Sequence, residues 1–179
     1  MGNHHWLGGI EYLDGSLYAI GYEDFEGDVF LIRIDNPGTP SQTVTQIGDT
    51  FGDVSDFGQP FALCSDGKGN LLGFTAKWLP HEYLYSFDPV TGEATLLREY
   101  TAGIDAFGKI EGLDHIGGKL YAMSVEGTVY ELDGTTYDLT EIGTLPEGCW
   151  TALVAVPEPG VALMMLGGVA ALVMRRRRR

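Results

Sequence analysis

Basic residues are scarce through most of this 179-residue chain. Residues 1–156 contain six lysines and arginines against 24 acidic residues, a net charge of −18. Glu158 and the five terminal arginines then bring the whole chain to −14. An acidic body repels nucleic acid and anionic membrane surfaces, so we expect no nucleic-acid partner.

Cysteines and catalytic motifs are scarce as well. The two cysteines, Cys64 and Cys149, are too far apart in sequence to form a metal-ligand pair at close spacing. The chain contains neither a His-Glu-x-x-His zinc motif nor a Gly-x-Ser-x-Gly nucleophile elbow. We therefore predict no catalytic residues, no metal site and no cofactor.

Sustained helical periodicity is missing before residue 157, and the sequence instead repeats. "GGIEYLDGSLYAI" (8–20) reappears 103 residues later as "EGLDHIGGKLYAM" (111–123), and "FALCSDGKGNLLGF" (61–74) lies between them with the same layout. The unit is thus about 50 residues long and occurs three times, and "CWTALVAV" (149–156) resembles a fourth start. Residues alternate with period two inside each unit, which predicts four strands per unit.

The expected fold class is all-β, with four-stranded antiparallel repeats of a partial β-propeller over residues 1–155. Five dipeptides supply the positive φ angles that hairpin turns need: Asp14-Gly15, Asp66-Gly67, Gly117-Gly118, Glu126-Gly127 and Asp133-Gly134. The stretch "YLYSFDPVTGEATLL" (83–97) resembles the third-to-fourth strand hairpin of many propeller repeats. Small residues in each first strand, Gly9, Ala62 and Gly112, suit strands that line a crowded axis.

Three units are fewer than the four to eight blades of closed propellers. Two interpretations are open: a longer protein of which this is a part, or an open or oligomeric packing of the sheets. The start "MGNHHWLGG" favours the first, because a strand is expected almost at once and no secretory leader pattern precedes it. Cys64 and Cys149 belong to units that are not neighbours in a closed ring, so we expect no disulfide between them.

Residues 156–179 form a separate C-terminal segment. An apolar run of 14 residues, 161–174, is about 21 Å long as a helix, shorter than the roughly 20 residues of a stable membrane span. Basic residues stay on the cytoplasmic side, so the acidic body is expected outside. The predicted anchor residues are Val161, Leu163, Leu166, Leu172 and Met174, and the predicted cytoplasmic stop is Arg175, Arg176, Arg177, Arg178 and Arg179.

The order of these parts, Pro157-Glu158-Pro159, a short apolar helix and a terminal basic cluster, resembles the PEP-CTERM sorting signal of Gram-negative bacteria. The resemblance implies recognition and removal of the tail by exosortase, a membrane-embedded protease. It also implies transient anchoring in the inner membrane, then a place at the cell surface or in the extracellular matrix with its polysaccharide. A plain tail anchor without processing is the alternative for this segment.

Few residues of the body invite a chemical role. His115 lies beside Asp114, and the pair suits a catalytic or metal site at a propeller axis. We favour the alternative, that His115 is an ordinary strand histidine. The other histidines, His4, His5 and His81, form no motif. Asp49, Asp53 and Asp56 raise a calcium hypothesis, as does "EDFEGD" (23–28), but the spacing is not that of a calcium loop and solvated turns explain it better. Trp6, Trp78 and Trp150 either form a sugar-stacking surface or cap the packing of the blades.

The sequence thus predicts a non-enzymatic, exported protein whose body is a binding or structural module. A secreted propeller enzyme of the lyase, hydrolase or quinoprotein type, with its site at the axis, is the alternative. A polar cluster on the axis that includes His115 and Asp114 would favour the enzyme.

Overall fold

The computed structural model describes residues 5–23, 28–49, 51, 58–76, 81–101 and 110–146. These residues form strands joined by turns and contain no helix. Sheet 1 comprises β1 (His5–Leu13), β2 (Ser16–Glu23), β3 (Val29–Asp35) and β4 (Thr43–Ile47). Sheet 2 comprises β5 (Gln59–Ser65), β6 (Leu71–Ala76), β7 (His81–Phe87) and β8 (Ala94–Thr101). Sheet 3 comprises β9 (Ile110–Ile116), β10 (Lys119–Ser124), β11 (Thr128–Leu132) and β12 (Leu139–Thr144).

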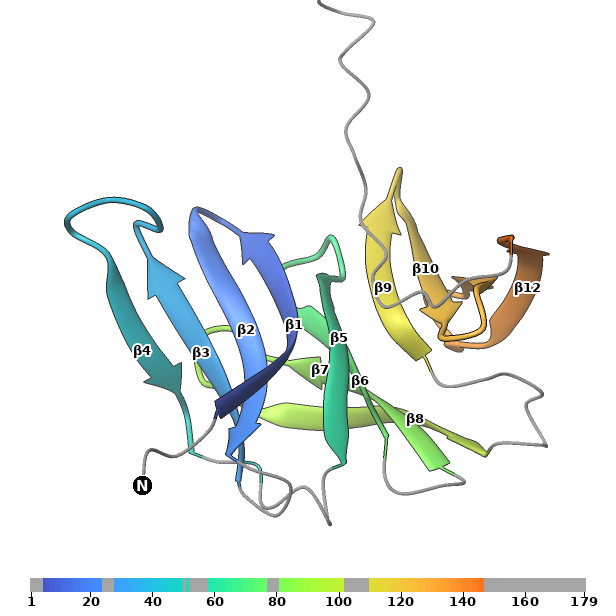
Figure 1. The fold of residues 1–179 in the computed structure, drawn as a ribbon, viewed down its shortest axis with the longest axis horizontal. Helices are drawn as coiled ribbons and strands as arrows, with labels where there is room; N and C mark the ends of the chain where they lie inside the picture. Colours follow the sequence, from blue (N-terminus) through green and yellow to red (C-terminus); the bar gives the residue numbers. More distant parts are fainter. Residues whose placement is uncertain are drawn as a thin grey trace, which may run out of the picture.

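Each sheet is an antiparallel meander of four consecutive strands (Figure 1). The registers of the three first hairpins match: Glu11 lies opposite Tyr18, Cys64 opposite Leu72, and Asp114 opposite Tyr121. The prediction of an all-β chain with three four-stranded antiparallel repeats is therefore confirmed.

The first strands of the three sheets lie side by side, β1 against β5 and β5 against β9 (Figure 1). Gly9 of β1 has no room for a side chain, because a Cβ atom there would lie 2.5 Å from the backbone nitrogen of Leu63. The expectation that small residues suit these crowded strands holds at this contact.

Two apolar clusters pack sheet 2 between its neighbours. One joins sheets 1 and 2 through residues that include Ile20, Leu31, Leu63 and Phe87. The other joins sheets 2 and 3 through residues that include Phe74, Leu84, Tyr100, Leu113 and Leu132. Both faces of sheet 2 are thus buried, and burial of apolar area is the main stabilising force of the fold.

The hairpin turns have positive φ angles at the glycines predicted from the sequence in all but one case. Asp14 has a φ of 49° and Gly15 one of 90°, so this two-residue turn is left-handed at both positions, as a type I′ turn requires. Positive φ angles also occur at the predicted turn glycines Gly67, Gly117, Gly118 and Gly127.

The prediction for Gly134 is wrong. Tyr137, with a φ of 58°, takes the left-handed position of that turn, and Gly134 does not. The reason is that the β11–β12 turn repeats the β7–β8 turn, in which Gly92 has a φ of 75°. Aligning Asp133 with Asp88, the residue that begins each turn, places Tyr137 on Gly92.

The two aspartates hold their turns in the same way. The Oδ1 atom of Asp88 accepts hydrogen bonds from the amides of Val90 and Thr91 at 2.7 and 2.9 Å. The Oδ1 atom of Asp133 accepts two such bonds, at 2.8 Å from Thr135 and 2.7 Å from Thr136. Side-chain caps of this kind are the usual reason for aspartate at a turn.

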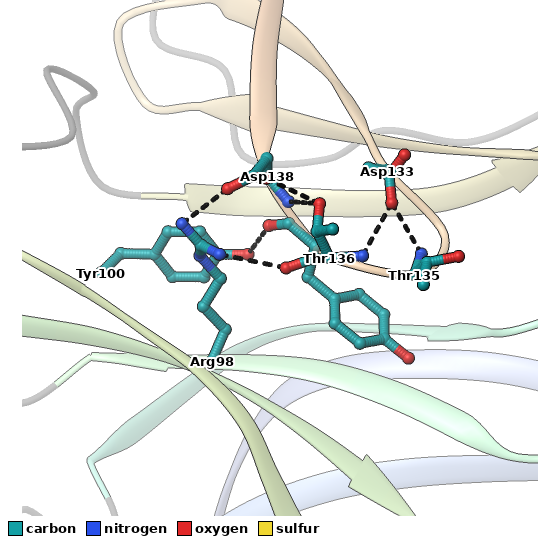
Figure 2. Close-up of polar contacts among 7 residues, drawn as sticks. Arg98, Tyr100, Asp133, Thr135, Thr136 and Asp138 are labelled. Carbon is teal, nitrogen blue, oxygen red and sulfur yellow. Dashed lines mark hydrogen bonds and ion pairs between the residues drawn. The ribbon is translucent and has the colours of Figure 1, made fainter.

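Polar contacts fasten sheet 2 to sheet 3 (Figure 2). Arg98 on β8 donates to the carbonyl oxygen of Thr136 at 3.0 Å and pairs with the carboxylate of Asp138 at 2.7 Å. The hydroxyl of Tyr100 donates to the carbonyl oxygen of Tyr137 at 2.6 Å. We call these three contacts the clasp; they fix the β11–β12 turn on the outer strand of the preceding sheet.

The predicted C-terminal helix, the fourth repeat start at 149–156 and the whole of 157–179 lie outside the described residues. Within the part of the chain that is described, no helix has the length and apolar character needed to span a membrane.

Candidate functional site

The first strands bring three chemically distinct side chains to equivalent positions. Glu11, Cys64 and Asp114 occupy the same place in β1, β5 and β9, as their registers show. The two carboxylates and the thiol interact electrostatically across the adjoining strands. We call this group the first-strand triplet.

Burial raises the pKa of Glu11 above its usual range, and the negative charge of Asp114 adds to that rise. A hydrogen bond from the backbone N–H of Ser65 acts in the opposite direction and favours the ionised carboxylate. Burial and the neighbouring Asp114 therefore make the ionised form of Glu11 unfavourable in the folded chain.

Cys64 is a buried free thiol; Cys149 lies outside the described residues. Burial raises the pKa of this thiol strongly, and the charges of Glu11, Asp114 and Asp66 raise it further. A thiol held protonated in this way is a poor nucleophile and a poor metal ligand. In the described part of the chain, no group of three or more histidine, cysteine or acidic residues is placed to hold a metal ion.

His115 and Asp114 do not form the imidazole–carboxylate pair that the enzyme hypothesis needs. They are consecutive residues of β9, so their side chains point to opposite faces of the sheet. Asp114 instead accepts a hydrogen bond from the backbone N–H of His115 at 2.7 Å. The imidazole of His115 lies over the β5–β6 turn, in the space that a Cβ atom on Gly67 would need.

A small open pocket of about 170 Å³ lies beside His115, between the β5–β6 turn and sheet 3. Charged groups of both signs line it, among them Asp66, Lys68 and Asp133. Lys119 and Glu131, also in the lining, form an ion pair at 2.8 Å. Asp66 accepts hydrogen bonds from the amides of its own turn, so part of this polar surface maintains the turns.

The other residues that the sequence singled out add little to a candidate site among the described residues. His81 on β7 lies 2.9 Å from the carboxylate of Glu99 on the neighbouring strand β8. Of the residues in the two calcium hypotheses, Asp28 and Asp49 are described and exposed, whereas 24–27, Asp53 and Asp56 lie outside the described residues. Trp78, Trp150, His4 and the sorting, anchor and basic residues also lie outside the described residues, and the Trp6 and His5 side chains are not described.

The first-strand triplet was missed as a group, although the sequence contained the signal for it. Aligning the repeats places Glu11 on Asp114, and the register of "FALC" adds Cys64. Among known proteins, no family model matches this chain, and no curated protein matches it either.

Replacing Glu11 with glutamine should raise stability more at about pH 7 than at about pH 4. The pKa of Glu11 is higher in the folded chain than its ordinary value of 4.5. The protonated side chain therefore contributes its full stabilisation below pH 4.5, and this contribution is lost as the pH rises through the folded-state pKa. Glutamine keeps an acceptor for Ser65 without a charge. Urea unfolding at the two pH values measures the difference, with Glu93→Gln in an exposed turn as the control. An equal gain for Glu11→Gln at both pH values would contradict the prediction.

Proposed function

We propose that this chain is an exported protein with a partial β-propeller body (1–155) and a C-terminal PEP-CTERM sorting signal (156–179). The observation that carries the proposal is the intact three-part tail: Pro157-Glu158-Pro159, the short apolar segment 161–174 and the arginines 175–179. An apolar segment of this length is marginal as a permanent anchor, and a signal that is later removed does not need to be one.

The propeller arrangement is supported by how the three sheets meet. Each sheet packs one face on the next, and the first strands β1, β5 and β9 adjoin, as blades do around an axis. Gly9 gives the close approach that such an axis demands.

A binding or structural role for the body in the extracellular matrix fits its chemistry better than catalysis does. Propellers carry specificity in turns and loops, and the pocket beside His115 is lined by such turns. The pocket suits a small polar group, such as one sugar unit of a polysaccharide, because it is smaller than the usual pocket of a drug-sized ligand. The enzyme alternative finds no support in the protonated thiol of Cys64 or in the divergent side chains of Asp114 and His115.

The sorting proposal predicts a mature protein outside the cell that lacks the arginine cluster. Changing Glu158 to alanine should leave the tail attached and the protein in the membrane fraction, because the motif would no longer be recognised. Intact mass and terminal peptide mapping of both forms, isolated from the native cells, measure this. Glu126→Ala, at an exposed turn of the body, is the matched control and should be processed normally.

A chain that still ends in Arg179 and stays in the cytoplasm would overturn the proposal. A membrane-bound chain that keeps Arg179 would point to the plain tail anchor instead.

A further inference from the structure

The repeated registers allow positions in the three sheets to be compared directly. One face of each sheet points toward the preceding sheet, and we call it the leading face. It contains Leu63, Leu71 and Phe87 in sheet 2, and Leu113, Leu120 and Leu132 in sheet 3, all buried in the clusters between sheets. The opposite face, which points toward the next sheet, is the trailing face.

Sheet 1 carries the same apolar pattern on its leading face, where the described residues place no preceding sheet. The equivalent positions there are Ile10, Leu17 and Ile34. Ile10 is 55% exposed, whereas its equivalents Leu63 and Leu113 are each 4% exposed.

Two further residues of this face are exposed, although Ala19, opposite Ile10 at its centre, is fully buried and Leu17 and Ile34 are half-buried. Tyr12 at the end of β1 is 61% exposed, and Val44 on the outer strand β4 is 60% exposed. The equivalents of Val44 in the other sheets, Ala94 and Leu139, pack against the two apolar clusters. Three exposed apolar side chains on one face, at positions that are packed between sheets elsewhere in the fold, mark a candidate interaction surface.

Sheet 3 presents the complementary face. Its trailing positions are Tyr121, Met123 and Val129. The matching residues of sheet 1, Tyr18, Ile20 and Leu31, are buried against sheet 2, and those of sheet 2 are buried against sheet 3. Met123 is buried, while Tyr121 and Val129 remain half-buried. Tyr121 repeats Tyr18, so this face closely matches one that already receives a leading face within the chain.

We propose that the leading face of sheet 1 packs on the trailing face of sheet 3 in a second copy of this chain, and that two copies close a ring of six sheets. Both sheet-to-sheet interfaces among the described residues join a trailing face to a leading face, so the contact between copies would continue an interface that the fold already uses. Head-to-tail contacts of this kind form a closed ring when the rotations complete a circle.

The number of copies follows from the number of blades in closed propellers, which is usually four to eight. The described part of one copy supplies three sheets, so two copies supply six, and three copies would exceed the range. The ring rests on the propeller arrangement proposed above but not on the sorting signal, so its failure would leave the processing experiment unaffected.

Sedimentation equilibrium of the full chain, in a detergent matched to the solvent density, gives the mass in solution. We expect twice the 19.4 kDa of one chain at micromolar concentrations. Ile10→Asp should give the mass of a single chain at the same concentrations, with at least a tenfold weaker association. Val90→Asp, at a turn residue that is 78% exposed and lies on neither face, is the control and should stay dimeric. Circular dichroism would verify that each variant is folded.

Mixing two variants tests the head-to-tail geometry. Val129→Asp alters the trailing face of sheet 3 and should also yield single chains. An equimolar mixture with Ile10→Asp should recover dimers, because one interface of the mixed pair contains neither substitution. A wild-type protein that sediments with the mass of one chain would overturn the proposal. Unchanged dimer formation by the Val129→Asp variant would also overturn the proposal, since such dimers would be joined through two leading faces.

Discussion

Replacing Gly9 with alanine is expected to lower the free energy of unfolding by about 3 kcal/mol, at the upper end for overpacking substitutions. The added Cβ atom would lie 2.5 Å from the backbone nitrogen of Leu63 and 2.8 Å from the carbonyl carbon of Ala62. Backbone atoms cannot rotate away as a flexible side chain can, so β1 and β5 would have to separate. Gly9 has no positive φ, and the effect is therefore steric rather than conformational.

Urea unfolding of the full chain measures this loss, and Gly134→Ala is the matched control. No heavy atom lies within 4 Å of a Cβ at Gly134, and its backbone is outside the left-handed region. The control should change the unfolding free energy by less than about 0.5 kcal/mol, as surface substitutions usually do. Similar losses in both variants would show that the contact between β1 and β5 is not as tight as the structure indicates.

The strands themselves were predictable because their signal is local. Period-two alternation set the faces, and paired turn residues such as Asp14 and Gly15 set the hairpins. Tyr137 shows the limit of that signal. A tyrosine with positive φ is uncommon, and here its carbonyl oxygen accepts from Tyr100 while its side chain packs against the cluster between sheets 2 and 3. Tertiary contacts thus outweigh the local preference for glycine.

The candidate site also has a part that the sequence predicts and a part that depends on tertiary contacts. The repeat alignment contains the equivalence of Glu11 and Asp114, and strand alternation alone excludes the pairing of Asp114 with His115. The partners of Arg98 were beyond prediction, because Thr136 and Asp138 lie about 40 positions along the chain and meet it only when two sheets pack.

Replacing Phe74 with alanine should cost about 4 kcal/mol, which is typical of a buried phenylalanine. Phe74 is 1% exposed and its ring lies 5.5 Å from that of Tyr100, centroid to centroid. The substitution would open a cavity in the cluster between sheets 2 and 3, directly beside the clasp. Phe74→Leu keeps most of the volume and should cost less than half as much. Urea unfolding gives both values, and equal losses would indicate that the site collapses around either side chain.

The same variant tests whether packing positions the clasp. Tyr100→Phe removes the hydroxyl that donates to Tyr137 and should cost about 1 kcal/mol alone. If the ring of Phe74 holds Tyr100 in place, that cost should fall toward zero in the Phe74→Ala background, a coupling of at least about 0.5 kcal/mol. Ile20→Ala, in the other cluster, should add to Tyr100→Phe without coupling. Additive losses for Phe74 and Tyr100 would mean instead that the hydroxyl is positioned by β8 and the turn alone, so that the polar clasp and the apolar cluster fasten sheet 3 independently.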